Sequence, residues 1–292
     1  MSDVLGFTGG RLDRVDHIRS DAAALGALFA DDYALRLRLD GLDPVVEDGR
    51  LAMEPLPRGA APEDHALLGV LDDGRPLFVG LETELRHAAA VSPRSWGVSA
   101  LVEPEETALY GGARSLVDWH ARHRFCAACG GGTQLEKAGW ARKCDGCGAE
   151  HFPRVDPVVI MLAEHDGRVL VGRQPRFPAG NYSALAGFVE PGEAIEEAVA
   201  RELKEEAGIA VRDVRYVMSQ PWPFPSSLMM ACLARADDDR LTLDLTELED
   251  AIWCDAAGVR AALEGAPDAP FRAPPPIAIA RHLLIHWLAM QP

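Results

Sequence analysis

A 23-residue stretch that begins at Gly187 constrains the fold of this chain more than any other segment. It reads GFVEPGEAIEEAVARELKEEAGI, a loop followed by a helix-forming run. The run predicts a helix at about 195–207, and Gly208 stands where a left-handed C-cap is expected. Arg201 is expected to pair with Glu193 and so to pin the loop to the helix.

The acidic residues of this helix are expected to point toward the protein interior. At about 100° per residue, Glu202 and Glu206 lie about 40° apart, and Glu205 lies within one turn. Ile195 and Val199 project along nearly the same line as Glu206, so one face begins apolar and ends in carboxylates. Charge runs are usually solvated, but inward carboxylates repel one another unless a cation neutralises them. The pattern predicts a site for Mg²⁺ or Mn²⁺, which take oxygen ligands.

The stretch resembles the Nudix box at every defining position. The resemblance implies an α/β/α sandwich and the hydrolysis of a nucleoside diphosphate linked to another moiety. It also implies that Glu202 and Glu206 are metal ligands, that Glu205 binds metal or helps activate water, and that the backbone carbonyl of Ala186 joins the metal site. These three glutamates are therefore the candidate catalytic residues.

Four cysteines form two CxxC pairs, Cys126 with Cys129 and Cys144 with Cys147, with 14 residues between the pairs. This is zinc-ribbon spacing, and nearby glycines supply the tight turns that let thiolates converge. A single CxxC also fits a redox motif, but two at this separation favour one zinc site. Because four thiolates leave no open coordination position, the predicted zinc is structural and not catalytic.

The charge of the chain limits the partners it can attract. It has 45 acidic and 29 basic residues, a formal net charge of −16. Such a field repels long nucleic acids and anionic membranes in general. A local basic cluster surrounds the four cysteines and consists of Arg122, Arg124, Lys137, Arg142 and Lys143. Two interpretations of this cluster stay open, ordinary solvated charge and a patch that faces phosphate.

The segment from Ser219 to Ser227 reads SQPWPFPSS. Its three prolines predict a stiff, extended loop that holds Gln220 and a serine hydroxyl at set positions, with aromatic faces nearby. Alone, it would be a rigid structural loop. Together with the zinc ribbon and the Nudix box, it resembles the NADH pyrophosphatase branch of the Nudix hydrolases. This resemblance covers about residues 104–292.

The branch resemblance implies a substrate class and partners. Members cleave the pyrophosphate of NADH or NAD⁺ to (reduced) nicotinamide mononucleotide and AMP, and some remove the NAD cap from the 5′ end of RNA. They act as homodimers with Mg²⁺ or Mn²⁺. The resemblance also implies that Glu247, six residues before Trp253, is a further metal ligand. Many relatives carry an acidic residue before the ribbon tryptophan, where this chain has Gly139.

The same resemblance implies which residues contact the substrate. Phe152 of a neighbouring subunit and Phe188 would stack on the two faces of the nicotinamide, although isolated aromatic residues of this kind are by default core residues. The remaining implied contacts are Gln220, Pro221, Trp222, Pro223, Phe224, Pro225, Ser226, Ser227 and Ala280.

We expect an α+β chain of three parts. These are a small α+β domain at 1–122, a Cys₄ zinc ribbon at 123–152, and a Nudix α/β/α sandwich with a mixed sheet at 153–292. In the last part, an Asp166-Gly167 turn is expected between two strands. The further expected elements are helices at 21–29, 104–121 and 274–288, and strands at 33–39, 76–80, 158–163, 169–173, 184–189, 211–218, 228–236 and 251–254.

The sequence has no signal-peptide layout and no run of 18 apolar residues, so a cytoplasmic location without a membrane partner is expected. Three alternatives stay open for function. A non-catalytic sensor of NAD or ADP-ribose would be expected to lack the metal-binding acids, which this chain keeps. A hydrolase of ADP-ribose or diadenosine polyphosphates would share the same site. An enzyme acting mainly on capped RNA predicts a continuous basic path from the ribbon to the site.

Overall fold

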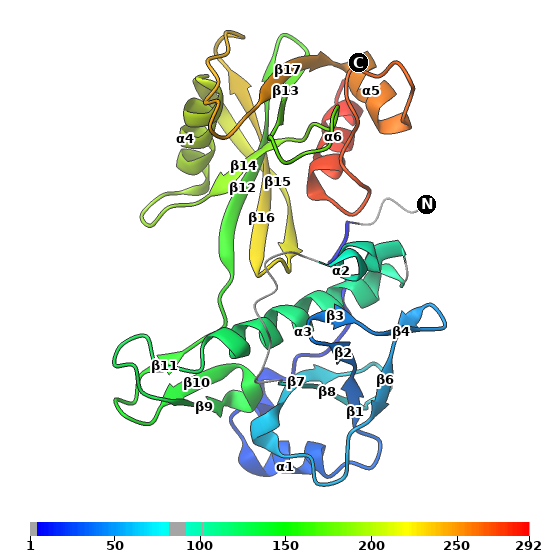
Figure 1. The fold of residues 1–292 in the computed structure, drawn as a ribbon, viewed down its shortest axis with the longest axis vertical. Coiled ribbons are helices and arrows are strands. Elements are labelled where there is room, and N and C mark those ends of the chain that lie inside the picture. The colour runs from blue at the N-terminus through cyan, green and yellow to red at the C-terminus, as the bar shows by residue number, and fades with distance from the viewer. Residues whose placement is uncertain (1–4, 82–91, 101, 292) are drawn as a thin grey trace. The chain divides into compact units, whose positions relative to one another are not determined.

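The computed structural model describes residues 5–81, 92–100 and 102–291, and the chain forms two compact units (Figure 1). The first unit consists of the N-terminal stretch ending at Gly6, of Asp156–Pro221, and of the chain from Ser227 on. The second consists of Phe7–Val155 and Trp222–Ser226. In the described part of the chain, no helix is long and apolar enough to cross a membrane.

The first unit is built on a six-stranded mixed sheet. Its strand order is β15-β16-β12-β13-β17, and β14 pairs with β12 outside this path. β12 runs parallel to β16 and antiparallel to β13 and β14. The strands are β12 (Asp156–His165), β13 (Arg168–Arg173), β14 (Leu185–Phe188), β15 (Val211–Trp222), β16 (Ser227–Ala236) and β17 (Asp250–Asp255).

Helices cover both faces of this sheet (Figure 1). They are α4 (Ile195–Ala207), α5 (Ala256–Glu264) and α6 (Ile279–Ala289). Successive side chains of a strand point to opposite faces. Accordingly, Ile160 and Leu162 pack in the core formed with α5 and α6, whereas Val159 and Met161 pack in the core formed with α4. The unit is therefore an α/β/α sandwich with a mixed sheet, as the sequence predicts.

Local sequence signals set the ends of these elements. α4 has the predicted bounds, and Gly208 caps it with φ of 76°, a left-handed conformation that glycine adopts at little cost. Arg201 pairs with Glu193 as expected, with 2.6 Å between Nε and Oε1. Asp166 and Gly167, both with positive φ, form the turn between β12 and β13.

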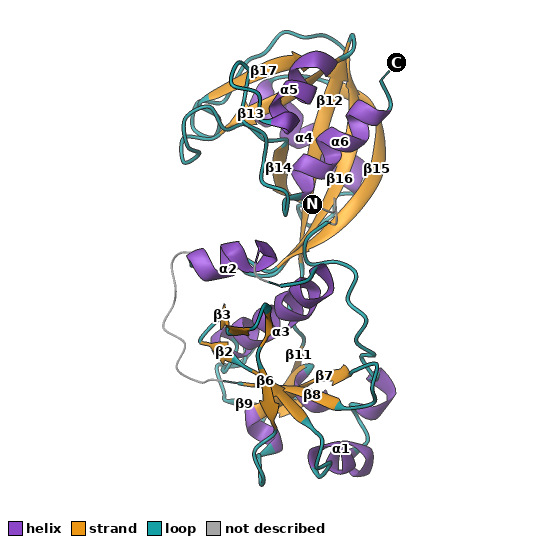
Figure 2. Ribbon diagram, turned by 90° about the vertical axis from the view of Figure 1, so that its right-hand side faces the viewer, coloured by secondary structure: helices purple, strands orange, loops and turns teal. Residues whose placement is uncertain are grey.

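The second unit contains a four-stranded sheet of order β6-β1-β8-β7. On one face, Leu25, Leu28 and Phe29 of α1 pack against Leu67 and Phe78 of the sheet. Figure 2 shows α1 and α3 on opposite sides of this sheet. The elements are α1 (Ala22–Phe29), β1 (Leu35–Leu37), β2 (Leu39–Asp40), β3 (Asp43–Pro44), β4 (Val46–Glu47), β5 (Arg50–Leu51), β6 (Met53–Pro55), β7 (His65–Val70), β8 (Pro76–Gly80), α2 (Pro93–Gly97) and α3 (Pro104–Arg122).

A small three-stranded sheet follows α3 and carries the two CxxC pairs. Its order is β11-β10-β9, and both pairings are antiparallel. The strands are β9 (Thr133–Glu136), β10 (Ala141–Cys144) and β11 (Glu150–His151). The sequence predicted the four-cysteine unit in this region but none of its three short strands.

Candidate active site

The acidic face of α4 points into the first unit. Glu202 is 8% exposed and Glu206 is 2% exposed, and Val199 and Leu203 of the same helix are fully buried. The predicted inward direction of Glu202 and Glu206 is therefore confirmed. The apolar residues at the start of this face pack in the core, and the carboxylates lie on the same face. Glu205 lies at the edge of this face, with its side chain 60% exposed.

Strand β14 lies against these carboxylates. A Cβ atom added to Gly187 would lie 1.9 Å from Cδ and Oε1 of Glu202, so the glycine makes room for the carboxylate. β14 is held in register by β12, where Ile160 faces Ala186 and Val159 faces Gly187. Ala186, whose carbonyl is expected in the metal site from the family resemblance, thus directly precedes Gly187, which the Glu202 carboxylate contacts.

The electrostatics of the site favour a bound cation. Burial, and after it the nearby charges of Glu202 and Glu247, raise the pKa of Glu206 to about 8. Among the described residues, Glu206 Oε2 is buried without a hydrogen-bond partner. Burial also raises the pKa of Glu202, against the opposing effect of Arg201. A buried, unpaired carboxylate oxygen beside like charges is costly unless a cation joins it, so these residues fit a divalent metal.

Glu247 reaches the site from the segment before β17. Its negative charge is close enough to Glu206 to raise the pKa of that carboxyl group. Two contacts hold this segment in place, because Leu248 is buried and the backbone N–H of Asp244 donates to the carbonyl of Glu206, at 3.0 Å. The sequence alone indicates a surface acid at Glu247. The residue is indeed exposed, and its charge acts on both Glu206 and Glu202.

Arg201 organises the acids more widely than the sequence predicted. Its guanidinium donates to Glu193 through two nitrogens, at 2.6 and 3.0 Å. It also donates to Glu202 Oε1 and Glu205 Oε2, each at 2.9 Å, and to the carbonyl of Phe188, at 2.9 Å. The i, i+4 spacing of Arg201 and Glu205 is typical of an ion pair on a helix, so this contact could have been predicted from the sequence. One arginine therefore ties the box loop, β14 and two of the candidate catalytic acids together.

The two predicted stacking residues are exposed and not part of a core. Phe188, in the first unit, is 61% exposed, and Phe152, in the second unit, is 53% exposed. Lys137 Nζ lies 4.8 Å from the centroid of the Phe152 ring. The default interpretation of these residues as core aromatics is therefore wrong, and both rings offer a surface for stacking.

The predicted substrate loop is held differently along its length. Gln220 is fully buried, Pro221 is exposed, and Trp222–Ser226 belong to the second unit, while Ser227 begins β16 in the first. The Gln220 amide donates to the carbonyls of Gly6 and Ile277 and accepts from Ile279 N–H. Ala280 is 3% exposed and lies in the core, so little of this residue is open to a ligand.

The four ribbon cysteines form a second site, in the second unit. Their sulfur atoms all lie within 4.8 Å of one another, with Cys129 and Cys144 Sγ at 3.4 Å and Cys126 and Cys147 Sγ at 3.7 Å. Tetrahedral zinc with Zn–S bonds of about 2.3 Å requires sulfur separations of about 3.8 Å. The geometry therefore fits a structural Zn²⁺ bound by four thiolates.

Two members of the basic cluster around the ribbon are engaged in contacts within the protein. Arg142 is buried, donating to the hydroxyl and carbonyl of Thr133 at 2.7 Å and contacting His120 Nδ1 at 3.0 Å. Arg122 pairs with Asp118 at 2.9 Å. Of the two interpretations left open by the sequence, a phosphate-facing patch cannot include Arg142.

The residue before the ribbon tryptophan is Gly139, with φ of 88°, and a Cβ atom there would lie 2.5 Å from Ala66 Cβ. The backbone at this position therefore leaves no room for a side chain.

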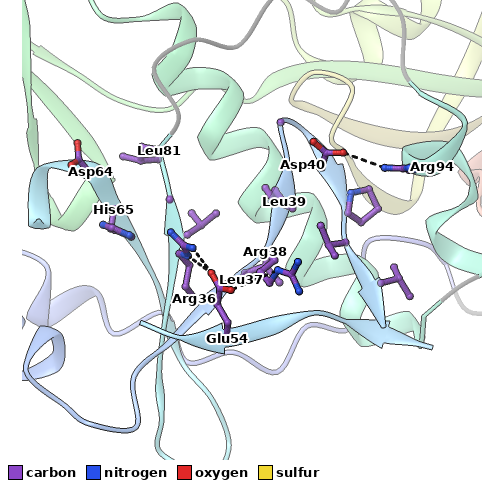
Figure 3. A pocket seen from close by; sticks show the side chains of 16 residues that line it. Arg36, Leu37, Arg38, Leu39, Asp40, Glu54, Asp64, His65, Leu81 and Arg94 are labelled. Atoms are coloured by element: carbon purple, nitrogen blue, oxygen red, sulfur yellow. Dashed lines mark hydrogen bonds and ion pairs between the residues drawn. The ribbon is translucent and has the colours of Figure 1, made fainter. Parts of the chain in front are cut away.

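A large hollow in the second unit has a different character. It has a volume of about 1180 Å³, and Figure 3 shows its labelled arginines beside carboxylates. Arg36 pairs with Glu54, and Arg94 pairs with Asp40 at 3.2 Å. Among the described residues that line this hollow, none has a buried carboxylate oxygen without a partner, as Glu206 has on α4.

Comparison with known proteins agrees with this geometry. The NADH pyrophosphatase zinc ribbon domain matches residues 121–152, and the NUDIX domain matches residues 153–273. A protein named NAD-capped RNA hydrolase NudC, from Mycobacterium tuberculosis, is 37% identical over 302 residues, which cover 96% of this chain and 93% of that protein. The chain belongs to the Nudix hydrolase family. Within this family it carries the zinc ribbon of the NADH pyrophosphatases.

Two mammalian members of the family are similar over a shorter stretch. The proteins named NAD-capped RNA hydrolase NUDT12 from Macaca fascicularis and Homo sapiens are 45% and 44% identical to this Nudix chain over 201 residues. The match covers 65% of this chain and 44% of each relative. It therefore spans less than half the length of these two proteins.

Proposed function

We propose that this Nudix chain hydrolyses the pyrophosphate bond of NADH and NAD⁺, free or as the 5′ cap of RNA, with Mg²⁺ or Mn²⁺. The observation that carries the proposal is the buried Glu206, whose Oε2 lacks a partner among the described residues and whose pKa is raised to about 8 beside Glu202 and Glu247. The substrate class is supported by its zinc ribbon and by the names of its relatives.

The residues divide the work as follows. Glu202, Glu206, Glu247 and the Ala186 carbonyl would hold the divalent cation. When bound, the cation would neutralise the charge of the pyrophosphate and make a water molecule more acidic. Arg201 holds Glu202 and Glu205 in place. Water attacks one phosphorus, the P–O–P bond breaks, and nicotinamide mononucleotide and AMP leave. Glu205 accepts the proton of the water on Oε1, because Arg201 engages Oε2.

The exposed rings suggest how the nicotinamide is bound. We infer a homodimer in which Phe152 of one copy and Phe188 of the other stack on the ring, since both residues are more than half exposed. Sedimentation equilibrium should give a dimer mass, and Phe152→Ala should raise KM for NADH. A monomer with full activity would contradict this inference.

We also propose a cytoplasmic location. All six cysteines of the chain are free, and four of them must stay reduced as thiolates to bind zinc. Disulfide-forming compartments oppose this state. A fluorescent fusion that accumulated in an oxidising compartment would contradict the proposal.

A substrate panel tests the function directly. NADH, NAD⁺, ADP-ribose, a diadenosine polyphosphate and NAD-capped RNA are assayed side by side with Mg²⁺ and with Mn²⁺. We expect NADH, NAD⁺ or capped RNA to give the highest kcat/KM. Glu206→Gln should lower kcat at least about a hundredfold, since it removes a charged metal ligand.

The matched control is Glu196→Gln, the same chemical change on the exposed side of the same helix. It should keep wild-type kinetics. Full activity of Glu206→Gln would refute the site, whereas preference for ADP-ribose or diadenosine polyphosphate would keep the site and refute the substrate class.

A further inference from the structure

One face of α3 contacts two parts of the chain that lie far from it in the sequence, Phe7 and the segment Trp222–Ser226. The face is formed by residues at positions i, i+4, i+7 and i+8 of the helix, namely Thr107, Gly111, Arg114 and Ser115. Residues with this spacing share one side of a helix. At the start of the face, the Thr107 hydroxyl oxygen accepts a hydrogen bond from Phe7 N–H, at 2.9 Å. The other three residues meet the segment Trp222–Ser226.

Arg114 and Ser115 bind the backbone of this segment. The Arg114 guanidinium donates to the carbonyl of Pro223, and its central carbon lies 4.8 Å from the centroid of the Phe224 ring. The Ser115 hydroxyl donates to the carbonyl of Pro225, at 3.2 Å. Because Arg114 is only 6% exposed, its own contacts are shielded from water and gain in strength, whereas the Ser115 hydrogen bond is exposed.

Gly111 makes room for the segment on the helix surface. A Cβ atom there would lie 3.1 Å from Phe7 Cδ1 and 3.5 Å from Pro223 Cγ. The first distance is tighter than ordinary van der Waals contact, so a larger side chain would push Phe7 or Pro223 away from the helix. The glycine therefore lets Phe7 and Pro223 lie closer to the helix than a side chain at this position would.

The aromatic rings of the segment pack in a cluster inside the second unit. The Trp222 and Phe224 rings meet edge to face, with centroids 5.3 Å apart. Trp96 of α2 stacks on Phe224 at 5.4 Å, and Phe7 meets both segment rings edge-on at 5.9 and 5.8 Å. Such pairs are favoured geometries for aromatic rings. Together, Phe7, Trp96 and the four α3 residues form what we call the loop seat.

The seated segment leads directly into the sheet of the first unit. β16 begins at Ser227, and its residue Met229 pairs with Val158 of β12. On the other side of β12, Val158 pairs with Phe188. The start of β16 and the exposed ring of Phe188 therefore lie in the same row of the sheet. Ser226 and Ser227 are joined by a peptide bond, so the position of the segment fixes where β16 begins, two residues before Met229.

We propose that the loop seat positions the segment Trp222–Ser226 and thereby sets substrate affinity, which gives the N-terminal half of the chain a role in the reaction. The inference rests on the proposed function, since it takes the row containing Phe188 to face the dinucleotide. Arg114, Gly111 and Trp96 act as positioning residues that do not touch the substrate. Loss of the seat weakens binding and leaves the carboxylates of α4 in place.

The test compares Arg114→Met and Trp96→Leu in the full-length, zinc-loaded protein. Each variant should raise KM for NADH at least fivefold while kcat stays within twofold of the wild type. Trp96 is 44% exposed, so its replacement leaves the fold intact even where the loss of Arg114 does not. Tryptophan emission should change in both variants. Trp96→Leu removes a ring that lies 5.4 Å from Trp222, and Arg114→Met removes the guanidinium from Phe224, whose ring lies 5.3 Å from Trp222.

The control is Leu116→Ala on the opposite side of α3, where the residue is 2% exposed. It should lower the melting temperature at least as much as Arg114→Met and keep KM unchanged. Unchanged KM in both seat variants, or an equal rise in Leu116→Ala, would overturn the proposal. A wild-type protein inactive on NADH but active on another dinucleotide would refute the substrate and not the seat, and KM is then measured on that dinucleotide.

Discussion

The carboxylate of Glu202 fills the space directly beside the α-carbon of Gly187. A Cβ atom on that glycine would lie 1.9 Å from Cδ and Oε1 of the glutamate and 2.2 Å from Oε2. This contact explains why the first residue of the box must lack a side chain. The contact also packs β14 against α4, so that the Glu202 carboxylate lies beside the backbone of β14.

Gly187→Ala should therefore inactivate the protein while leaving it folded. The added methyl group would displace the Glu202 carboxylate by an ångström or more, and misplacement on this scale costs about a hundredfold in rate. Steady-state kinetics on NADH and circular dichroism are the measurements. Gly112→Ala is the matched control, because a Cβ atom there has nothing within 4 Å, and it should keep full activity. Normal kinetics in Gly187→Ala would show that Glu202 can move without consequence.

The pKa of Glu206 makes the stability of the metal-free site depend on pH. Because the pKa is raised from 4.5 to about 8 on folding, the folded state binds more protons than the unfolded state between these values. Stability is therefore highest below about pH 4.5 for this group and is lost as pH rises to about 8, by roughly 3 to 5 kcal/mol. Added Mg²⁺ or Mn²⁺ should restore it, since the metal binds the deprotonated form.

Urea unfolding of zinc-loaded protein at pH 6 and pH 8, without other metals, measures this loss. The Glu206→Gln variant supplies the comparison, because an amide does not titrate and the difference between the two pH values should shrink. An identical pH dependence in both proteins would mean that Glu206 ionises normally in the fold.

The sequence predicted those features of the site that depend on residues close together along the chain. The bounds of α4 follow from its helix-forming run and from Gly208, and the inward direction of Glu202 and Glu206 follows from the helical period. The bonds of Arg201 to Glu202 and Glu205 were within reach of the same reasoning, since they join residues one and four positions apart.

Contacts between distant residues were beyond such reasoning. Gln220 binds Gly6 and Ile277, which lie 214 and 57 positions away. Arg114 binds Pro223, 109 positions away. No periodicity or spacing encodes these pairs, because each arises only when distant parts of one unit fold together. For the same reason, the sequence places Arg142 in a basic cluster but does not indicate its buried contacts with Thr133 and His120.

Cys144→Ser should release zinc and unfold the ribbon. The four sulfur atoms lie within 4.8 Å of one another, and without the metal their closeness has no compensating bond. Structural zinc contributes on the order of 10 kcal/mol in isolated zinc-binding peptides, so we expect a clear fall in melting temperature. Metal analysis and thermal unfolding are the measurements. Cys232→Ala, which removes a buried thiol outside the ribbon, should keep one zinc per chain. One tightly bound zinc in Cys144→Ser would contradict the four-thiolate site.

Gln220 is a further candidate for substitution, because the family resemblance makes it a substrate contact whereas its side chain is fully buried. Both amide hydrogens and the carbonyl oxygen are used, at 2.9, 2.7 and 2.9 Å from Gly6 O, Ile277 O and Ile279 N. Gln220→Leu would leave these backbone groups buried without partners, at about 1 to 3 kcal/mol each.

We therefore expect Gln220→Leu to lower the free energy of unfolding by about 3 kcal/mol or more and to change KM for NADH and ADP-ribose by the same factor. A side chain with no donor left cannot distinguish the two ligands. Urea unfolding and the two KM values are measured together, with the exposed Gln134→Leu as the control that should alter neither. Wild-type stability combined with a selective loss of NADH affinity would show that the Gln220 amide turns to bind the nicotinamide half of the substrate.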